Sequence, residues 1–335
     1  MMDGSLLQWP WVRLKTEHPY ARDFFAARGL PAMSGRQTVS AFLAELEPGR
    51  WEDLGMDPDQ LTEQFLSFIH QMEGLQKRRT DRINHLTIVG GKNKDGRSEK
   101  IQLTLRAGEV IAVVGPTGSG KSMLLSDIEC LAQGDTPSGR RILIDNQTPD
   151  ETGPFSGEHR LVAQLSQNMN FVMDLSVREF LSLHAESRLA ADIEGIVEQV
   201  FNTAEALTGE PFSMDTPVTA LSGGQSRALM IADVACLSAS PVVLIDEIEN
   251  AGVDRRKALN LLVKKEKIVL MATHDPLLAL NCSRRIVIRN GGMAAILDTT
   301  AEEKELLGKL DRIDARFALL RNRIRNGDRL EADLE

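Results

Sequence analysis

The chain has 335 residues, of which 42% are hydrophobic, and a formal net charge of −9, so it is long enough for one large α/β domain and a smaller one. Its apolar runs are all short and its start has no basic region before an apolar one, so we expect neither a membrane-spanning helix nor an export signal. The negative charge argues against nucleic acid as a partner, and the three widely separated cysteines argue against a disulfide framework or a zinc site, as in a cytoplasmic protein.

Residues 1–80 predict a separate helical domain, since they hold most of the aromatic residues of the chain. Apolar side chains recur with the period of a helix around residues 39–46 and 61–72, and a proline and a glycine bound a further helix at 20–27. Because helical spacing already explains most of the aromatic residues, we expect them to form the core of this domain rather than a binding face.

The segments after this domain predict β-structure. Residues 77–79 are basic and are expected to form a solvated connector. Residues 83–89 and 101–105 alternate apolar and polar side chains on either side of a turn at Asp95-Gly96, which predicts an antiparallel hairpin. The run 109–114 is short, apolar and β-branched, as in a buried parallel strand.

A glycine-rich loop follows that strand and consists of Gly115, Pro116, Thr117, Gly118, Ser119, Gly120, Lys121 and Ser122. Its glycines let successive N–H groups point at phosphate oxygens. Lys121 adds a positive charge for the β- and γ-phosphates, and the Ser122 hydroxyl can ligate Mg²⁺. A helix opens at Ser122, with its positive end toward the same phosphates. This context favours a nucleotide site over an ordinary glycine turn.

Two further strand ends carry polar side chains. Asp246 and Glu247 follow the apolar run 242–245; we expect Asp246 to hold Mg²⁺ and Glu247 to take the proton from an attacking water. An acid pair that caps the next segment is the alternative. His274 follows the apolar run 268–271 and can reach a γ-phosphate, although a histidine at such a position is more often incidental.

The remaining segments are predicted to be helical, apart from a closing hairpin around Gly291-Gly292. Residues 172–240 contain Leu221-Ser222-Gly223-Gly224-Gln225 ahead of a helix from Arg227 to about Leu237. In the tail, six apolar residues at alternating spacings of four and three form a seven-residue repeat: Leu306, Leu310, Ile313, Phe317, Leu320 and Ile324. This repeat fits a short coiled coil between two subunits and a long helix packed on its own domain equally well.

In their order and spacing, these motifs resemble the ATP-binding cassette family over about residues 83–300. Ser222-Gly223-Gly224-Gln225 looks like the signature motif of that family. Gln167 looks like its glutamine switch, which implies a second role as a ligand of Mg²⁺, and His274 looks like its histidine switch. In the family, the signature residues contact the γ-phosphate held by the opposite subunit, so the resemblance implies active sites that two cassettes share.

Two features depart from the pattern of the family. Glu247 is followed by residues 248–254 instead of a proline and a serine-alanine-leucine-aspartate loop, and Asp254 is the expected counterpart of that aspartate. Residues 83–106 contain no aromatic residue that would stack on adenine. His85 is a candidate for that role, but we favour a surface position for it. Recognition of adenine is therefore unassigned.

The fold class that we expect is an α/β P-loop NTPase of the ABC ATPase type with antiparallel β and helical subdomains. An N-terminal helical domain (1–80) precedes the ATP-binding domain (81–300), and a C-terminal amphipathic helix (301–335) follows it. The resemblance implies Mg²⁺-dependent hydrolysis of ATP, in which bound ATP clamps together two cassettes, either a homodimer or a pair of paralogues, and hydrolysis releases them.

What the clamp moves is a separate question. We favour a soluble ATPase that remodels or matures a protein or metalloenzyme partner, because residues 1–80 and 301–335 add protein-facing surface. The alternative is the ATPase subunit of a membrane transporter, with permeases supplied by other chains.

Overall fold

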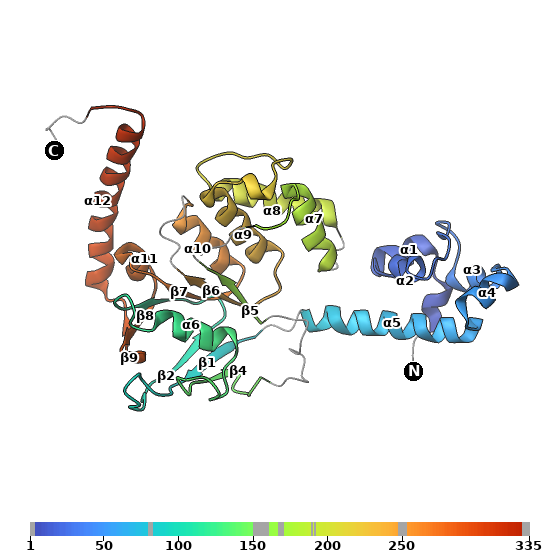
Figure 1. The fold of residues 1–335 in the computed structure, drawn as a ribbon, viewed down its shortest axis with the longest axis horizontal. Helices are drawn as coiled ribbons and strands as arrows, with labels where there is room; N and C mark the ends of the chain where they lie inside the picture. The colour runs from blue at the N-terminus through green and yellow to red at the C-terminus, as the bar shows by residue number, and fades with distance from the viewer. Residues whose placement is uncertain are drawn as a thin grey trace. The chain divides into compact units, whose positions relative to one another are not determined.

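The computed structural model describes residues 4–79, 83–149, 161–166, 171–188, 190, 192–246 and 253–329. By its contacts the chain divides into two units, Met1–Asp81 with Arg178–Gln199 and Arg82–Val177 with Val200–Glu335 (Figure 1). The C-terminal helix belongs to the second unit. The division at residues 80 and 300 that the sequence suggests stays a prediction.

The N-terminal segment is helical and has an aromatic core. Its elements are η1 (Gly4–Gln8), α1 (Trp11–Glu17), α2 (Ala21–Ala26), α3 (Val39–Ala44), α4 (Pro48–Leu54) and α5 (Pro58–Arg79). The Thr38 side chain caps α3 by accepting from the Ala41 N–H at 3.2 Å. All nine aromatic residues of this segment belong to one apolar cluster, in which rings such as Phe24 and Phe65 meet edge to face. The expectation that these aromatic residues form a core is confirmed.

The described residues of the second unit form two sheets. A three-stranded antiparallel sheet has the order β2-β1-β4, and a six-stranded sheet has the order β5-β6-β7-β3-β8-β9, in which β9 alone runs antiparallel to its neighbour. The pairing of β1 with β2 confirms the predicted hairpin. The strands are β1 (His85–Val89), β2 (Gln102–Arg106), β3 (Val110–Val114), β4 (Arg141–Ile144), β5 (Val162–Leu165), β6 (Val242–Asp246), β7 (Ile268–Ala272), β8 (Arg284–Arg289) and β9 (Gly292–Asp298).

The central strands of the six-stranded sheet are buried on both faces. Ile111 and Val113 of β3 join one apolar cluster, whereas Ala112 between them joins another. Successive residues of β6 and β7 divide in the same way, as the two-residue period of a strand requires. The later helices are α6 (Lys121–Glu129), α7 (Val177–Ser187), α8 (Ile193–Leu207), η2 (Val218–Ala220), α9 (Gly223–Cys236), α10 (Arg255–Lys264), α11 (Pro276–Asn281) and α12 (Ala301–Arg325).

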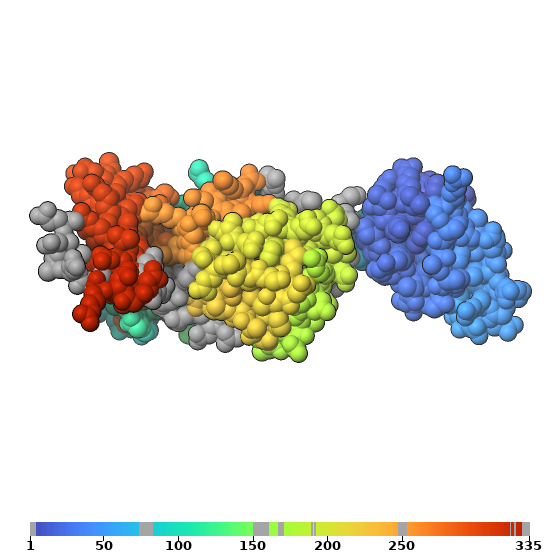
Figure 2. Space-filling model, turned by 90° about the horizontal axis from the view of Figure 1, so that it is seen from above, coloured from blue at the N-terminus to red at the C-terminus, as the bar shows by residue number. Residues whose placement is uncertain are grey.

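Helix α12 lies on its own unit through its acidic side chains (red in Figures 1 and 2). These form ion pairs with arginines of the unit: Glu303 with Arg285, Asp311 with Arg256, and Asp314 with Arg255. The Arg285 hydrogen bond, with help from the Thr300 N–H, lowers the pKa of Glu303. The apolar repeat predicted from the sequence is left largely outward, and four of its residues are about half exposed: Leu306, Ile313, Phe317 and Ile324.

Candidate nucleotide-binding site

The glycine-rich loop connects the end of β3 to the start of α6, as predicted. Gly120 has a φ of +106° and caps the helix. A Cβ atom on it would lie 2.8 Å from the Gly291 Cα atom, so both the conformation and the close contact require glycine. The N–H groups in the first turn of α6 have no partner within the helix, and they are donors of the kind that bind a phosphate.

Lys121 is buried, and its ammonium group folds back over the loop. The Nζ atom donates to the Gly115 carbonyl oxygen at 3.0 Å and to that of Pro116 at 3.4 Å. It also lies 3.0 Å from His274 Nε2. An ammonium group has only donors, so the ring nitrogen accepts and a neutral His274 carries its proton on Nδ1. Lys121 and His274, which are both predicted to reach the γ-phosphate, therefore lie in direct contact.

The Ser119 hydroxyl is a second sign of a ligand. Ser119 is buried, and among the described residues its Oγ atom has no hydrogen-bond partner. A buried polar atom without a partner is costly. A phosphate oxygen on the loop would supply an acceptor, so the residues of the loop fit the group that their sequence predicts.

Strand register brings the other predicted residues to the same edge of the sheet. Val113 on β3 is paired with Ala272 on β7, which is paired with Asp246 on β6. Three adjacent parallel strands therefore end at this edge, where ligands bind in open α/β sheets. The half-buried Asp246 ends β6, His274 follows β7, and the loop with Lys121 follows β3.

Two predicted residues are not placed by the structure. Gln167 and Glu247 lie outside the described residues, so their roles stay predictions. In the described ranges, no three His, Cys, Asp or Glu side chains converge as metal ligands. A Mg²⁺ ion would depend on the exposed Ser122, on Asp246 and on oxygen atoms of the nucleotide.

Replacing Lys121 by methionine should weaken ATP binding by ~100-fold or more, because it removes the cation that faces the phosphates. Titration calorimetry with Mg-ATP measures the change. Lys264→Met, on the exposed last turn of α10, is the control and should bind as the natural chain does. Equal affinity of the Lys121→Met and Lys264→Met proteins would show that the loop does not hold the phosphates.

The predicted signature residues begin α9. The Ser222 Oγ atom accepts from the Gln225 N–H at 3.3 Å, and Gln225 Oε1 accepts from the Ser222 N–H at 2.9 Å, which completes a capping box. This box starts the helix at Gly223, four residues before the predicted start at Arg227. Ser222 and Gly223 are exposed, and a Cβ atom on Gly223 would meet nothing within 4 Å. The Gln225 amide also donates to the Pro211 carbonyl at 3.1 Å, so this side chain serves its own subunit.

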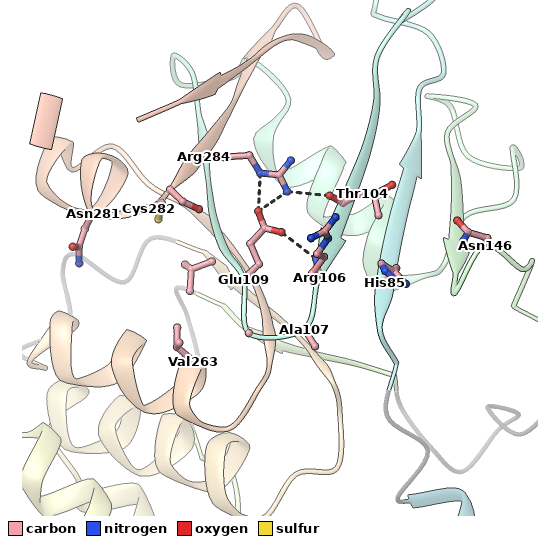
Figure 3. Close-up of a pocket in the computed structure, with 13 residues that line it drawn as sticks. His85, Thr104, Arg106, Ala107, Glu109, Asn146, Val263, Asn281, Cys282 and Arg284 are labelled. Carbon is pink, nitrogen blue, oxygen red and sulfur yellow. Dashed lines mark hydrogen bonds and ion pairs between the residues drawn. The ribbon is translucent and has the colours of Figure 1, made fainter. Parts of the chain in front are cut away.

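An open pocket of about 930 Å³ lies at the opposite end of β3 and β8 and is also lined by the first residue of β1, a strand of the other sheet (Figure 3). Arg284 crosses this edge, donating to Glu109 Oε1 at 2.6 Å and to the Thr104 carbonyl at 2.9 Å. Burial raises the pKa of the Cys282 thiol to about 12, so this thiol is protonated near neutral pH. His85 lines the same pocket with its side chain 41% exposed, in the surface position that the sequence favours.

Two basic residues near the loop lie outside the motifs predicted from the sequence. Lys94 Nζ donates to the Gly118 carbonyl at 3.0 Å, and Arg140 is fully buried against two carboxylates. Neither belongs to a motif or a periodic pattern, and the partners of Arg140 are up to 151 residues away in the sequence. Only the three-dimensional structure identifies them.

The sheet order and the loop define an α/β P-loop nucleotide-binding domain. Residues 98–250 match the family model described as ABC transporter. The chain is 54% identical over 249 residues to an uncharacterized ABC transporter ATP-binding protein of Methanocaldococcus jannaschii, an alignment that covers 74% of this chain and 95% of the relative. The chain belongs to the ATP-binding cassette (ABC) family, whose members bind and hydrolyse ATP.

More distant relatives include the macrolide export ATP-binding/permease protein MacB of Psychrobacter cryohalolentis, which is 30% identical over 206 residues. That match covers 58% of this chain and 30% of MacB. Among solved structures, cbiO1 from Clostridium perfringens, part of the ABC transporter complex cbiONQ, is 25% identical with a TM-score of 0.48 and covers 69% of this chain and 94% of its own. Of the described helices, none combines the length and the apolar character needed to cross a membrane.

Proposed function

We propose that the chain is the ATPase subunit of an ABC transporter whose permease is supplied by other chains. The supporting observation is its 54% identity to a transporter ATP-binding protein over 95% of that relative, together with the convergence of Lys121, Asp246 and His274 at one sheet edge. The comparisons favour this role over the protein-remodelling role that the sequence favoured.

In this proposal, the glycine-rich loop and Lys121 bind the phosphates of ATP. Ser122, Asp246 and Gln167 would hold Mg²⁺, which neutralises charge on the β- and γ-phosphates. Glu247, the residue after the last position of β6, accepts the proton of the attacking water. His274, beside Lys121, donates a hydrogen bond to the γ-phosphate, and the Ser119 hydroxyl gains an acceptor.

The site is completed by a second cassette, either another copy of this chain or a paralogue. Within its own subunit, the exposed signature segment at Ser222 and Gly223 meets no phosphate loop among the described contacts. In a two-fold dimer, each signature segment faces the nucleotide of the other subunit. ATP then favours the closed dimer, and hydrolysis releases it.

The N-terminal segment suggests a second role, in which a protein partner regulates ATP hydrolysis. The N-terminal segment has its own aromatic core and lies outside residues 98–250, which match the family model. Because most of its aromatic side chains are buried, a partner of this segment would bind mainly the other, exposed side chains of α1 to α5. A protein that binds there can alter hydrolysis only by favouring the open or the closed dimer.

Isolation of the tagged full chain from a gentle detergent lysate tests the transporter proposal. We expect integral membrane proteins to co-purify in defined stoichiometry and to be retained when residues 1–80 are removed. A parallel preparation of the Arg178→Glu variant, changed in the segment around Gln167–Arg178 by which the family meets permeases, should lose them. Recovery with a cytoplasmic enzyme instead, lost on removal of residues 1–80, would favour the remodelling role.

A further inference from the structure

The guanidinium group of Arg140, next to the first residue of β4, binds three other segments of the chain. Its side chain is 0% exposed. The Nη1 atom donates to Asp127 Oδ2 at 2.8 Å, the Nε and Nη2 atoms donate to the Glu99 carboxylate, and Nη2 also donates to the Gly291 carbonyl at 2.6 Å. Both carboxylates are nearly fully buried, at 3% exposed. One cation therefore compensates two buried anions, which would be costly to leave unpaired.

One of these partners contacts the phosphate loop, and another lies on the helix that follows the loop. Asp127 lies on α6, the helix that the loop opens. Gly291 lies in the turn between β8 and β9, and its N–H donates to the Ser119 carbonyl at 2.6 Å. Glu99 precedes β2 and also accepts from the Met293 N–H at 3.1 Å, at the start of β9. A continuous path of hydrogen bonds thus runs from Arg140 through Gly291 to the backbone of the loop.

The backbone of the loop touches this turn without intervening side chains. A Cβ atom on Gly120 would lie 2.8 Å from the Gly291 Cα atom, and one on Gly115 would lie 2.5 Å from the Ile288 carbonyl oxygen. Lys94 adds a second connection, since its N–H donates to the Asn290 carbonyl at 2.8 Å and its Nζ to the Gly118 carbonyl. Because packing this close leaves no slack, a displaced turn displaces the loop.

We propose that Arg140 is a positioning residue for nucleotide binding: with Glu99 and Asp127 it holds the β8–β9 turn against the phosphate loop, so that the N–H groups of the loop are aimed at the phosphates. The inference rests on the proposed binding of ATP at this loop. The positioning role requires the planar guanidinium group of arginine. A lysine ammonium keeps the charge but does not bind two carboxylates and a carbonyl in one fixed geometry.

The test variant is Arg140→Lys, which preserves the charge balance of the buried cluster. We expect the Kd of Mg-ATP from calorimetry and the KM for ATP to rise about tenfold, the effect of one lost charge-assisted hydrogen bond. The kcat at saturating ATP should change less than about twofold, because loosened positioning weakens ground-state and transition-state binding alike. A purely structural role would lower the melting temperature and the active fraction and leave the Kd unchanged, which would overturn the proposal.

Arg284→Lys is the matched control. Arg284 also pairs with a glutamate and a backbone carbonyl (Figure 3), but it is the first residue of β8, whereas the turn that contacts the loop follows the last residue of that strand. We expect it to lower the melting temperature and leave the Kd unchanged; an equal rise in Kd for both variants would contradict a local positioning role.

Glu99→Gln serves as a second variant if Arg140→Lys does not fold, since it retains the pair between Arg140 and Asp127. It should also raise the Kd, and an unchanged value would overturn the proposal. Absence of ATP binding by the natural chain is a different result, because it would refute the proposed function before either variant is compared.

Discussion

Replacing Glu247 by glutamine should lower ATP turnover by ~10²-fold or more, the effect expected for loss of a positioned general base, while ATP still binds. Glu247 directly follows Asp246, the last residue of β6. Asp246 is paired with Ala272 of β7, two residues before His274. Glutamine keeps the size and hydrogen-bonding capacity of the side chain but does not accept the proton of the attacking water. Phosphate release at saturating Mg-ATP gives the turnover, and calorimetry gives the affinity.

Glu249→Gln is the control for this experiment, because it removes the same charge two residues further along the chain. It should retain turnover close to that of the natural protein. With ATP, the Glu247→Gln protein should also sediment as a dimer, since the closed state is no longer released by hydrolysis. Full turnover of the Glu247→Gln protein would assign the base elsewhere, with His274 or Gln167 as the next candidates.

Replacing Gly223 by aspartate should lower the rate of ATP turnover by ~10²-fold or more relative to the natural chain. ATP binding by the isolated subunit should stay intact. A Cβ atom at Gly223 meets nothing within 4 Å, so the variant should fold normally. Its new carboxylate would face the γ-phosphate of the other subunit, where two negative charges in a partly desolvated interface repel strongly. Turnover, calorimetric affinity and sedimentation with ATP together separate loss of dimerisation from loss of binding.

Gly209→Asp is the matched control for this substitution. Gly209 is also exposed, and a Cβ atom on it also meets nothing within 4 Å. It should hydrolyse ATP and dimerise as the natural chain does. Hydrolysis at full rate by a strictly monomeric protein, or by the Gly223→Asp variant, would show that the active site is complete within one subunit.

The sequence predicted the parts of the site that short motifs encode. The glycine-rich loop, the acidic end of β6 and the histidine after β7 each follow a buried strand in the chain, and parallel pairing then brings the three strand ends together. The aromatic core of the N-terminal segment was predictable for a similar reason, since helical periodicity is a local signal.

Other features were not predicted from the sequence. The capping box of α9 uses a glutamine that belongs to the signature motif, so the start of the helix was predicted at Arg227 instead of Gly223. Helix α12 packs on its own unit through ion pairs of three acidic residues with three arginines, a contact that the apolar repeat did not predict. Long-range ion pairs of this kind have no periodic signature in the sequence.

The capping box at Ser222 also bears on how fast two cassettes can join. At the start of α9, the side chains of Ser222 and Gln225 are already fixed, because each accepts a hydrogen bond from the backbone N–H of the other. The conformational entropy of ordering this segment is therefore lost during folding of the monomer and not at the encounter. A segment that is ordered before the encounter needs no slow rearrangement after it, so its association rate should be set by diffusion and orientation.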